Sequence, residues 1–346
     1  MKIAVINCGS SSLKFKLFEM PSGNMLEEKL VENIGERGSP IQNHQQALES
    51  LSIDLDKVDL VGHRVVHGGE QFHESVVIDE GVIETIESLN HLAPLHNPAN
   101  LQGIKLIQQL LPNVKQVAVF DTAFHHSLEK KAYLYALPYE MYEKDHIRRY
   151  GFHGTSHVYL LKEAAKQLGK PIQETNLITL HLGNGESVCA VKNGKSIDIS
   201  MGFTPLEGLI MGTRSGDIDP EIVLYMQKDL GLSVDEVDTI LNKRSGLLGI
   251  CGENDVRKIL KRDDEQANLA IEMMIRKIQK YIGAYLVLLE GDVDALVFSG
   301  GIGEHSQVIR DKIMDNLMLK NMKYLVIETD EEKEIASECL EVVKNI

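Results

Sequence analysis

One pattern recurs in both halves of the chain: an apolar, strand-like run breaks into a turn of glycine and small polar residues. The first copy, IAVINCGSSSLKFKLF at 3–18, predicts a hairpin of two strands. The second, LITLHLGNGESVCAVKNGKSIDISMG at 177–202, predicts a meander because Gly-Asn-Gly and Asn-Gly turns separate its runs. The third, ALVFSGGIGEHS at 295–306, predicts a strand that leads through a glycine turn into a helix. Because one hairpin opens each half, the sequence predicts a duplicated α/β unit with a cleft between the copies.

These glycine turns also suit phosphate binding. A glycine between two strands is most often only a turn residue. Three such turns in one chain favour a further interpretation, because backbone N–H groups can approach phosphate oxygens where no Cβ intervenes. The three segments therefore predict a site for the phosphates and sugar of a nucleotide.

The rest of the chain fits an α/β protein. The polar segment 19–60 is interpreted as a surface connection, and the tail 329–346, which starts with acidic residues, predicts a C-terminal helix. Amphipathic stretches predict further helices at 81–90, 99–111, 156–168, 220–230, 234–243 and 265–289.

Length and charge exclude several classes of protein. At roughly 150 residues per domain, 346 residues predict about two domains. No apolar run reaches the ~18 residues of a membrane-spanning helix, and polar residues interrupt the N-terminal run before a signal-peptide core could form, so we expect a cytoplasmic protein. The net charge of −15 argues against nonspecific binding to nucleic acid or to a membrane surface, so any anionic substrate needs a local cationic pocket. The four widely spaced cysteines predict reduced thiols.

Several short segments between positions 62 and 157 combine His, Arg or Asp with Gly, Pro or Asn, which is typical of functional sites. The histidines raise the alternative of a zinc site, but there is no HExxH arrangement and no cysteine partner, so we expect no structural zinc. The segments are GHRVVHGGE at 62–70, LAPLHNPAN at 92–100, VFDTAFHHS at 119–127 and RRYGFHGTSH at 148–157.

Arginines in glycine-rich settings indicate a cationic pocket. Arg214 lies between two glycines in MGTRSGDIDP, where a guanidinium can bind phosphate or carboxylate through two parallel hydrogen bonds. For this arginine alone, local pairing with Asp217 or Asp219 is the alternative. Arg64 and Arg149 occupy similar settings, and together the three favour a pocket for anions.

The combined features predict phosphoryl transfer supported by a divalent metal. Such chemistry requires cations and isolated acids such as Asp121, Asp255 and Glu331, because charge builds on the equatorial oxygens of the transferred group. No general base is needed if the acceptor is a carboxylic acid, since a pKa of roughly 4 to 5 leaves it ionised at neutral pH.

The motifs resemble those of the acetokinase family, the acetate kinases, within the superfamily of sugar kinases, Hsp70 and actin. The resemblance implies a two-domain, duplicated ribonuclease-H-like α/β fold (the actin-like ATPase fold) with an interdomain cleft. It implies an N-terminal domain at 1–123, completed by a C-terminal helix at 332–346, and a nucleotide-binding domain at 124–331. The matching motifs are VINCGSSSLKFKLF, GHRVVHGGE, LAPLHNPANLQGI, VAVFDTAFHHS, RRYGFHGTSH, HLGNGESV, SMGFTPLEGLIMGTRSGDIDP and VFSGGIGE.

The resemblance implies a phosphotransferase with a carboxyl group as acceptor. Its expected reaction is the reversible transfer of the γ-phosphoryl group of ATP to acetate, giving acetyl phosphate and ADP. The expected cofactor is Mg²⁺, with Mn²⁺ as a substitute, and the expected assembly is a homodimer.

The resemblance also implies roles for single residues. Arg64 and Arg214 flank the reacting groups, His153 stabilises the transferring phosphoryl group, and Asp121 positions the metal or the neighbouring arginine. The metal positions are Asn7 and Glu331. The substrate positions are Arg64, Val66, Leu95, His96, Phe152 and Pro205. The ATP positions are Ser10, Ser12, Lys14, His181, Leu182, Gly183, Asn184, Gly185, Asp255, Val256, Arg257, Gly301, Ile302, Gly303, Glu304 and His305.

Two alternatives stay open at this point. A propionate or butyrate kinase would differ in the acid it accepts, and one methylene is worth only ~1–3 kcal/mol in an apolar pocket. A non-catalytic nucleotide-binding regulator of the same superfamily would use domain closure for signalling. Such a regulator needs no cations beyond the γ-phosphate, whereas this chain has Arg64, His153 and Arg214.

Overall fold

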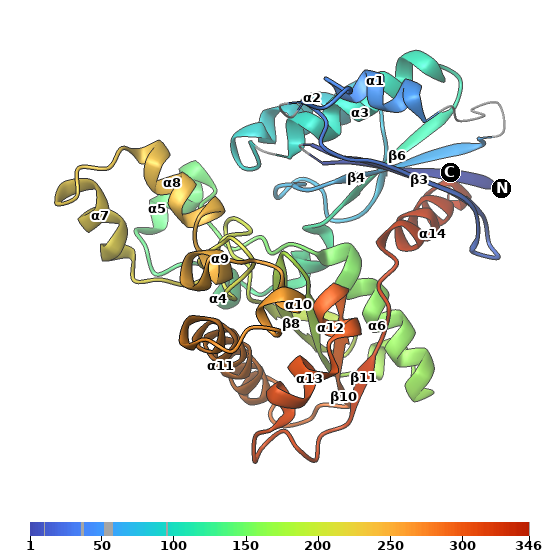
Figure 1. Ribbon diagram of the computed structural model, residues 1–346. Coiled ribbons are helices and arrows are strands. Elements are labelled where there is room, and N and C mark those ends of the chain that lie inside the picture. Colours follow the sequence, from blue (N-terminus) through green and yellow to red (C-terminus); the bar gives the residue numbers. More distant parts are fainter. Residues whose placement is uncertain (10, 36–37, 52–57, 95, 346) are drawn as a thin grey trace. The chain divides into compact units, whose positions relative to one another are not determined.

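A computed structural model describes the chain except for residues 10, 36–37, 52–57, 95 and 346 (Figure 1). The chain forms two compact units. Unit 1 contains Met1–His126, Gly154–Tyr159 and Asp330–Ile346, and unit 2 contains Ser127–His153 and Leu160–Thr329. Each unit is built around one mixed β-sheet. The domain boundaries implied by the resemblance stay predictions.

The sheet of unit 1 starts as an antiparallel meander and continues in parallel. Strands β1 (Lys2–Cys8), β2 (Leu13–Glu19) and β3 (Asn24–Val31) form the meander. On the other side of β1, β4 (Leu60–Val65) and β6 (Lys115–Phe120) pair in parallel, and the short β5 (Val76–Val77) joins β6. The resulting order is β3-β2-β1-β4-β6-β5.

Helices cover both faces of this sheet, which explains why its central strands are almost entirely apolar. Alternate residues of β1 face opposite layers: Ile3 and Val5 pack in one cluster with α14 (Glu331–Lys344), whereas Ala4 and Ile6 pack in another with α1 (His44–Ser50) and α3 (Asn97–Leu110). Figure 1 shows α14 on one side of the sheet and α1, α2 (Glu80–Ser88) and α3 on the other.

The sheet of unit 2 repeats the strand order of unit 1. Strands β7 (Leu177–Leu182), β8 (Glu186–Lys192) and β9 (Lys195–Ile199) form an antiparallel meander, and β10 (Ala295–Ser299) and β11 (Tyr324–Val326) continue the sheet in parallel. The order β11-β10-β7-β8-β9 matches that of unit 1 without its β5. This repetition confirms the predicted duplicated α/β fold.

The largest core cluster of unit 2 lies between this sheet and its helices. The long α11 (Glu265–Leu288) contributes Ile271, Met274, Ile278 and Ile282, as its helical periodicity predicts. The remaining helices are α4 (Lys130–Tyr133), α5 (Tyr139–Asp145), α6 (Gly154–Leu168, which begins in unit 1), α7 (Pro220–Lys228), α8 (Val234–Lys243), α9 (Gly246–Cys251), α10 (Val256–Ile259), α12 (Gly300–His305) and α13 (Gln307–Met314).

One prediction about the fold is wrong. Segment 19–60 is more than a surface connection, because it contains β3, α1 and the start of β4. β3 escapes detection because it is an edge strand: its residues alternate only between exposed and half-buried, so it lacks an apolar face. The hairpin, the meander, the strand–turn–helix segment and the C-terminal helix are confirmed. Within the described ranges, no helix has the length and apolar character needed to cross a membrane.

Candidate active site

In unit 1, the half-buried Arg64 and the buried Asp121 form an ion pair at adjacent strand ends. Asp121 directly follows β6 and is 1% exposed, and Arg64 comes from the neighbouring β4. Arg64 Nε lies 3.1 Å from both carboxylate oxygens and Nη2 lies 2.6 Å from Oδ2, while Thr155 Oγ1 donates to Oδ1 at 3.2 Å. Asp121 therefore holds the guanidinium in one orientation.

Asn7 and Glu331 flank the same guanidinium. Arg64 Nη1 lies 3.5 Å from Asn7 Oδ1, and Nε lies 4.0 Å from a carboxylate oxygen of Glu331. Burial raises the pKa of Glu331 to about 7; Arg64 opposes this, and the nearby carboxylate of Asp121 adds to it. Burial alone would lower the pKa of Arg64, but Asp121 and Glu331 outweigh it and hold that pKa above its ordinary value.

The donor set beside Arg64 fits Mg²⁺. An amide oxygen from Asn7 and a carboxylate from Glu331 are hard oxygen ligands of the kind that Mg²⁺ takes from proteins, in small number, with water and phosphate completing the shell. Over the described part of the chain, no group of three or more His, Cys, Asp or Glu side chains could hold a metal. Any metal here would thus depend on few protein ligands.

Lys14 points to the C-terminal helix in this structure. Its Nζ lies 3.0 Å from Glu332 Oε2 and 3.7 Å from Glu28 Oε1. Ser12 closes the first glycine turn, because its carbonyl accepts from the N–H of Gly9 at 2.9 Å. Ser10, also predicted in this phosphate turn, lies outside the described residues.

The predicted substrate positions fall in both units. In unit 1, Val66 is buried and its N–H donates to Asn100 Oδ1 at 3.1 Å, and His96 is half-buried at the start of α3. In unit 2, Phe152 is buried and Pro205 is half-buried. Leu95 lies outside the described residues.

In unit 2, the structure brings together His153, His181 and the second glycine turn. His153 Nδ1 lies 2.9 Å from Ser187 Oγ, and its ring centroid lies 4.3 Å from that of His181. Its left-handed backbone (φ 59°), uncommon for a residue with a side chain, ends the loop just before α6. A strained backbone at a histidine is typical of a functional position.

Arg214 lies against the same turn. A β-carbon on Gly185 would be 2.6 Å from Arg214 Nη2 and 3.6 Å from His153 Nε2, so only glycine allows this approach. Arg214 Nη1 donates to the carbonyl of Pro205 at 2.7 Å, and within the described structure this is the one hydrogen bond of its side chain. Its remaining N–H donors are suited to an anion. Burial lowers the pKa of Arg214, and the carboxyl group of Glu186 opposes that shift.

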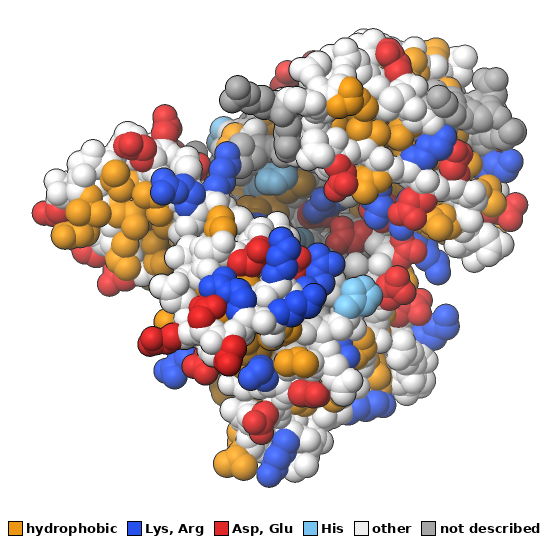
Figure 2. Space-filling model, viewed as in Figure 1, with side chains coloured by type: hydrophobic (Ala, Val, Ile, Leu, Met, Phe, Trp, Pro, Cys, Tyr) orange, Lys and Arg blue, Asp and Glu red, His pale blue; other side chains and the backbone are white. Residues whose placement is uncertain are grey.

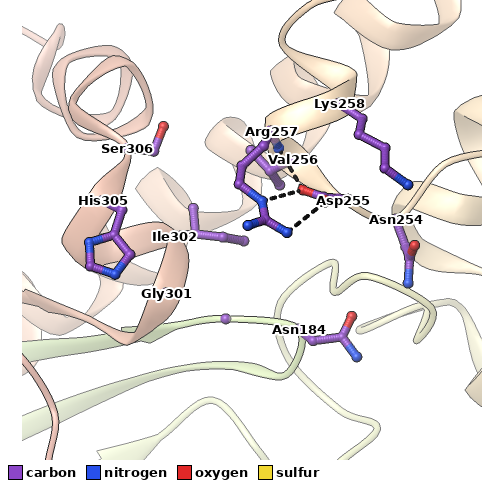
Figure 3. Close-up of a pocket in the computed structure, with 11 residues that line it drawn as sticks. Asn184, Asn254, Asp255, Val256, Arg257, Lys258, Gly301, Ile302, His305 and Ser306 are labelled. Carbon is purple, nitrogen blue, oxygen red and sulfur yellow. Dashed lines mark hydrogen bonds and ion pairs between the residues drawn. The ribbon is translucent and has the colours of Figure 1, made fainter.

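A cavity of about 670 Å³ lies beside the second and third glycine turns. Figure 3 shows Arg257 bound to Asp255 on one wall and Ile302 and His305 on another. Arg257 Nη2 lies 2.8 Å from Asp255 Oδ2, and this hydrogen-bonded pairing lowers the pKa of Asp255 to about 2. Figure 2 shows Lys and Arg side chains gathered around α10, next to this cavity. The lining residues are Gly183, Asn184, Asn254, Asp255, Val256, Arg257, Lys258, Gly301, Ile302, His305 and Ser306.

Of the thirteen ATP positions predicted in unit 2, five do not line the cavity. Leu182 is fully buried in the core, and Gly303 is buried in α12. Glu304 accepts hydrogen bonds from the backbone N–H groups of Gly300 at 2.8 Å and Thr329 at 3.0 Å, so its carboxylate stabilises the third glycine turn. The other two, His181 and Gly185, lie beside His153.

Two residues have places that sequence reasoning did not anticipate. Arg149, grouped with the cationic pocket, instead donates to the carbonyls of Ile199 at 2.8 Å and Met201 at 2.9 Å and to Glu207 at 2.5 Å. Glu186 was not predicted at all, although an acid inside the apolar run after Gly-Asn-Gly is a visible anomaly. It is fully buried beside Arg214.

Similarity to solved structures extends across the whole chain. The crystal structure of Porphyromonas gingivalis acetate kinase superposes with a TM-score of 0.91 at 40% identity, over 99% of both chains. A propionate kinase from Francisella tularensis superposes with a TM-score of 0.92 at 43% identity, again over 99% of both. A ROK family protein from Streptococcus pneumoniae, at 12% identity and a TM-score of 0.50, shares the fold alone.

Sequence comparison gives the same result. The profile of the acetokinase family matches residues 2–50 and 41–343. An acetate kinase from Sulfurimonas denitrificans is 51% identical over 98% of this chain and 98% of its own length, and one from Carboxydothermus hydrogenoformans is 48% identical over 100% of both. With the duplicated fold already described, these matches show that the chain belongs to the acetokinase family.

Proposed function

We propose that this chain is an acetate kinase, which transfers the γ-phosphoryl group of ATP reversibly to acetate and yields acetyl phosphate and ADP. The observation that carries the proposal is the group formed by His153 and Arg214 at the glycine turn 183–185. A half-buried guanidinium with one hydrogen bond has donors left for an anion, and the imidazole beside the same turn offers a second polar group.

The two clusters supply complementary parts of the reaction. In unit 2, the cavity beside α10 and α12 would hold the nucleoside, and Arg214 and His153 would stabilise charge on the transferring phosphoryl group. In unit 1, Asp121 orients Arg64, whose charge would offset repulsion between carboxylate and phosphate. A carboxylate oxygen of acetate forms the new bond to the γ-phosphorus, the bond from that phosphorus to the β–γ bridging oxygen breaks, and ADP leaves with the electron pair.

Asn7 and Glu331 are the proposed holders of Mg²⁺, which supplies charge neutralisation to phosphate oxygens when bound. Burial is the main cause of the raised pKa of Glu331, and a cation at this place would offset the smaller part that comes from the carboxylate of Asp121. In Asn7→Ala, we expect the Mg²⁺ concentration for half-maximal rate to rise.

A hydroxamate assay with ATP, Mg²⁺ and acetate tests the proposal directly. We expect acetyl hydroxamate to accumulate only when all three are present. Absence of product in protein that still binds ATP would favour the non-catalytic regulator instead.

A second candidate, propionate kinase, is favoured by the similarity to the Francisella enzyme. The two differ by one methylene in the acceptor, so the comparison must be quantitative. We expect kcat/KM to be higher for acetate than for propionate and butyrate. The reverse order would assign the chain to the second candidate.

We also propose that the protein acts as a cytoplasmic homodimer. Figure 2 shows hydrophobic side chains grouped over α7 and α8, and an exposed apolar surface of this kind is typical of an interface. The four cysteines are free and buried, which fits a reducing compartment. Sedimentation equilibrium and cell fractionation test these two statements. The exposed residues of this surface are Ile218, Ile222, Leu224, Tyr225, Leu230 and Val234.

A further inference from the structure

The carboxyl group of Glu186 is an unusual feature of unit 2. The residue opens β8 directly after the glycine turn, opposite Leu182 of β7, and its side chain is 0% exposed. Both carboxyl oxygens are buried, and neither has a hydrogen-bond partner among the described residues. Buried polar groups are nearly always hydrogen-bonded, so this one needs an explanation.

Its surroundings do not favour a charge. Side chains alternate along a strand, so Glu186 shares a face with Val188 and Ala190, which belong to the apolar core cluster between the sheet and the helices of unit 2. Ser187, on the other face, contacts His153. Burial accordingly raises the pKa of Glu186 well above its ordinary range. A leucine of similar size would be expected to give a more stable protein.

Arg214 is the one described charged group that acts on this carboxyl group. It comes from the loop after β9 and lies against Gly185, the residue before Glu186. The other titratable groups at the turn, the imidazoles of His153 and His181, contact each other near Gly185. Arg214 therefore lies next to the backbone that carries Glu186, and it is the group proposed above to bind an anionic substrate.

We infer that the carboxyl group of Glu186 competes with the anionic substrate for the guanidinium of Arg214 whenever this carboxyl group is ionised. The neutral acid leaves the full charge of Arg214 to the substrate. The carboxylate would offset that charge inside a poorly solvated site, where such an interaction is strong. Because burial keeps Glu186 uncharged at neutral pH, Arg214 would bind the anion there. Ionisation of Glu186 in alkali would weaken this binding.

This inference rests on the proposed function only for the identity of the anionic substrate. Its test therefore uses sulfate as the anion, because sulfate keeps the same charge from neutral to alkaline pH. Calorimetry measures the dissociation constant of sulfate from about pH 6 to about pH 10 for the wild type and for Glu186→Gln. Glu290→Gln is the matched control, because Glu290 is an exposed acid that pairs with Lys192 at the far end of β8. Arg214→Ala identifies the part of the signal that belongs to this site.

We expect equal affinities at neutral pH, within about twofold. In alkali, the logarithm of the dissociation constant should increase with pH for the wild type and for Glu290→Gln, with a limiting slope of about one per pH unit, as proton linkage requires. The dissociation constant of Glu186→Gln should stay constant over the same range. Glu186→Leu should also have a dissociation constant that does not change with pH, and its melting temperature should be higher than that of the wild type. This variant replaces Glu186→Gln in the test if the glutamine variant fails to fold.

Two results would overturn the inference. Parallel profiles of the wild type and Glu186→Gln would show that Glu186 does not compete for Arg214. A tenfold weaker affinity of Glu186→Gln at neutral pH would show that Arg214 needs the carboxylate. Failure of the proposed function is distinguishable, since it appears as missing hydroxamate in the wild type and leaves sulfate binding intact.

Discussion

We expect mild acid to destabilise the protein through His63. This imidazole is 2% exposed in β4, and burial lowers its pKa to about 4. The amide of Gln116 is satisfied when its nitrogen donates to His63 Nε2 at 2.7 Å and to the carbonyl of Ile104 at 3.3 Å, while its oxygen accepts from the N–H of Gln108 at 3.2 Å. His63 Nε2 is thus assigned as an unprotonated acceptor in the folded protein.

The sign and size of the effect follow from the two pKa values. The unfolded chain takes up the proton near pH 6.5 and the folded protein only near pH 4, so the unfolded state binds more protons between these values. The stabilisation is fully present above pH 6.5 and is lost as the pH falls toward 4. The loss between pH 7.5 and pH 5 amounts to about 2 kcal/mol.

Urea unfolding of His63→Gln at both pH values measures this contribution. Glutamine removes the titration and keeps an oxygen that can accept from Gln116. We expect the free energy of unfolding of the wild type to fall by about 2 kcal/mol more than that of the variant. His91→Gln, at an exposed histidine, should behave as the wild type. Equal losses in the wild type and His63→Gln would refute the reasoning.

Three further predictions concern the proposed active site. Arg64→Ala and Arg214→Ala should each reduce kcat by roughly 100-fold or more with an unchanged circular dichroism spectrum, because each removes a charge that offsets anion repulsion; near-normal turnover in both would contradict the assignment. Val66→Ala should raise kcat/KM for propionate relative to acetate by roughly tenfold, and an unchanged preference would argue against the proposed methyl pocket. Gly185→Ala should lower kcat/KM about tenfold or more, because the added carbon would displace Arg214; a wild-type value would show that Arg214 moves aside without consequence.

The fold was largely predictable because its signals are local. The hairpin at 3–18 and the meander at 177–202 follow from alternating residues and glycine turns, and both occur as antiparallel strands. The duplicated strand order follows from the recurrence of these hairpins. β3 was missed because an edge strand does not need an apolar face.

The site was predictable as a set of residues and less so as a set of contacts. Arg64 and Asp121 were both singled out, but their pairing joins positions 57 residues apart. The resemblance implies that Lys14 binds ATP phosphates, whereas in the structure its Nζ lies 3.0 Å from Glu332 Oε2, 318 residues away. Whether Lys14 exchanges this partner for a phosphate stays a prediction.

By itself, the sequence determined the hairpins, the amphipathic helices and the residues able to carry phosphoryl chemistry. These properties depend on neighbours a few positions apart, so periodicity and turn residues record them. Only the tertiary structure decided that Asp121 orients Arg64, that carbonyls engage Arg149, and that Glu186 lies in an apolar core beside Arg214. The physical reason is that the partners of a buried charge depend on how distant segments pack, and burial then sets its protonation.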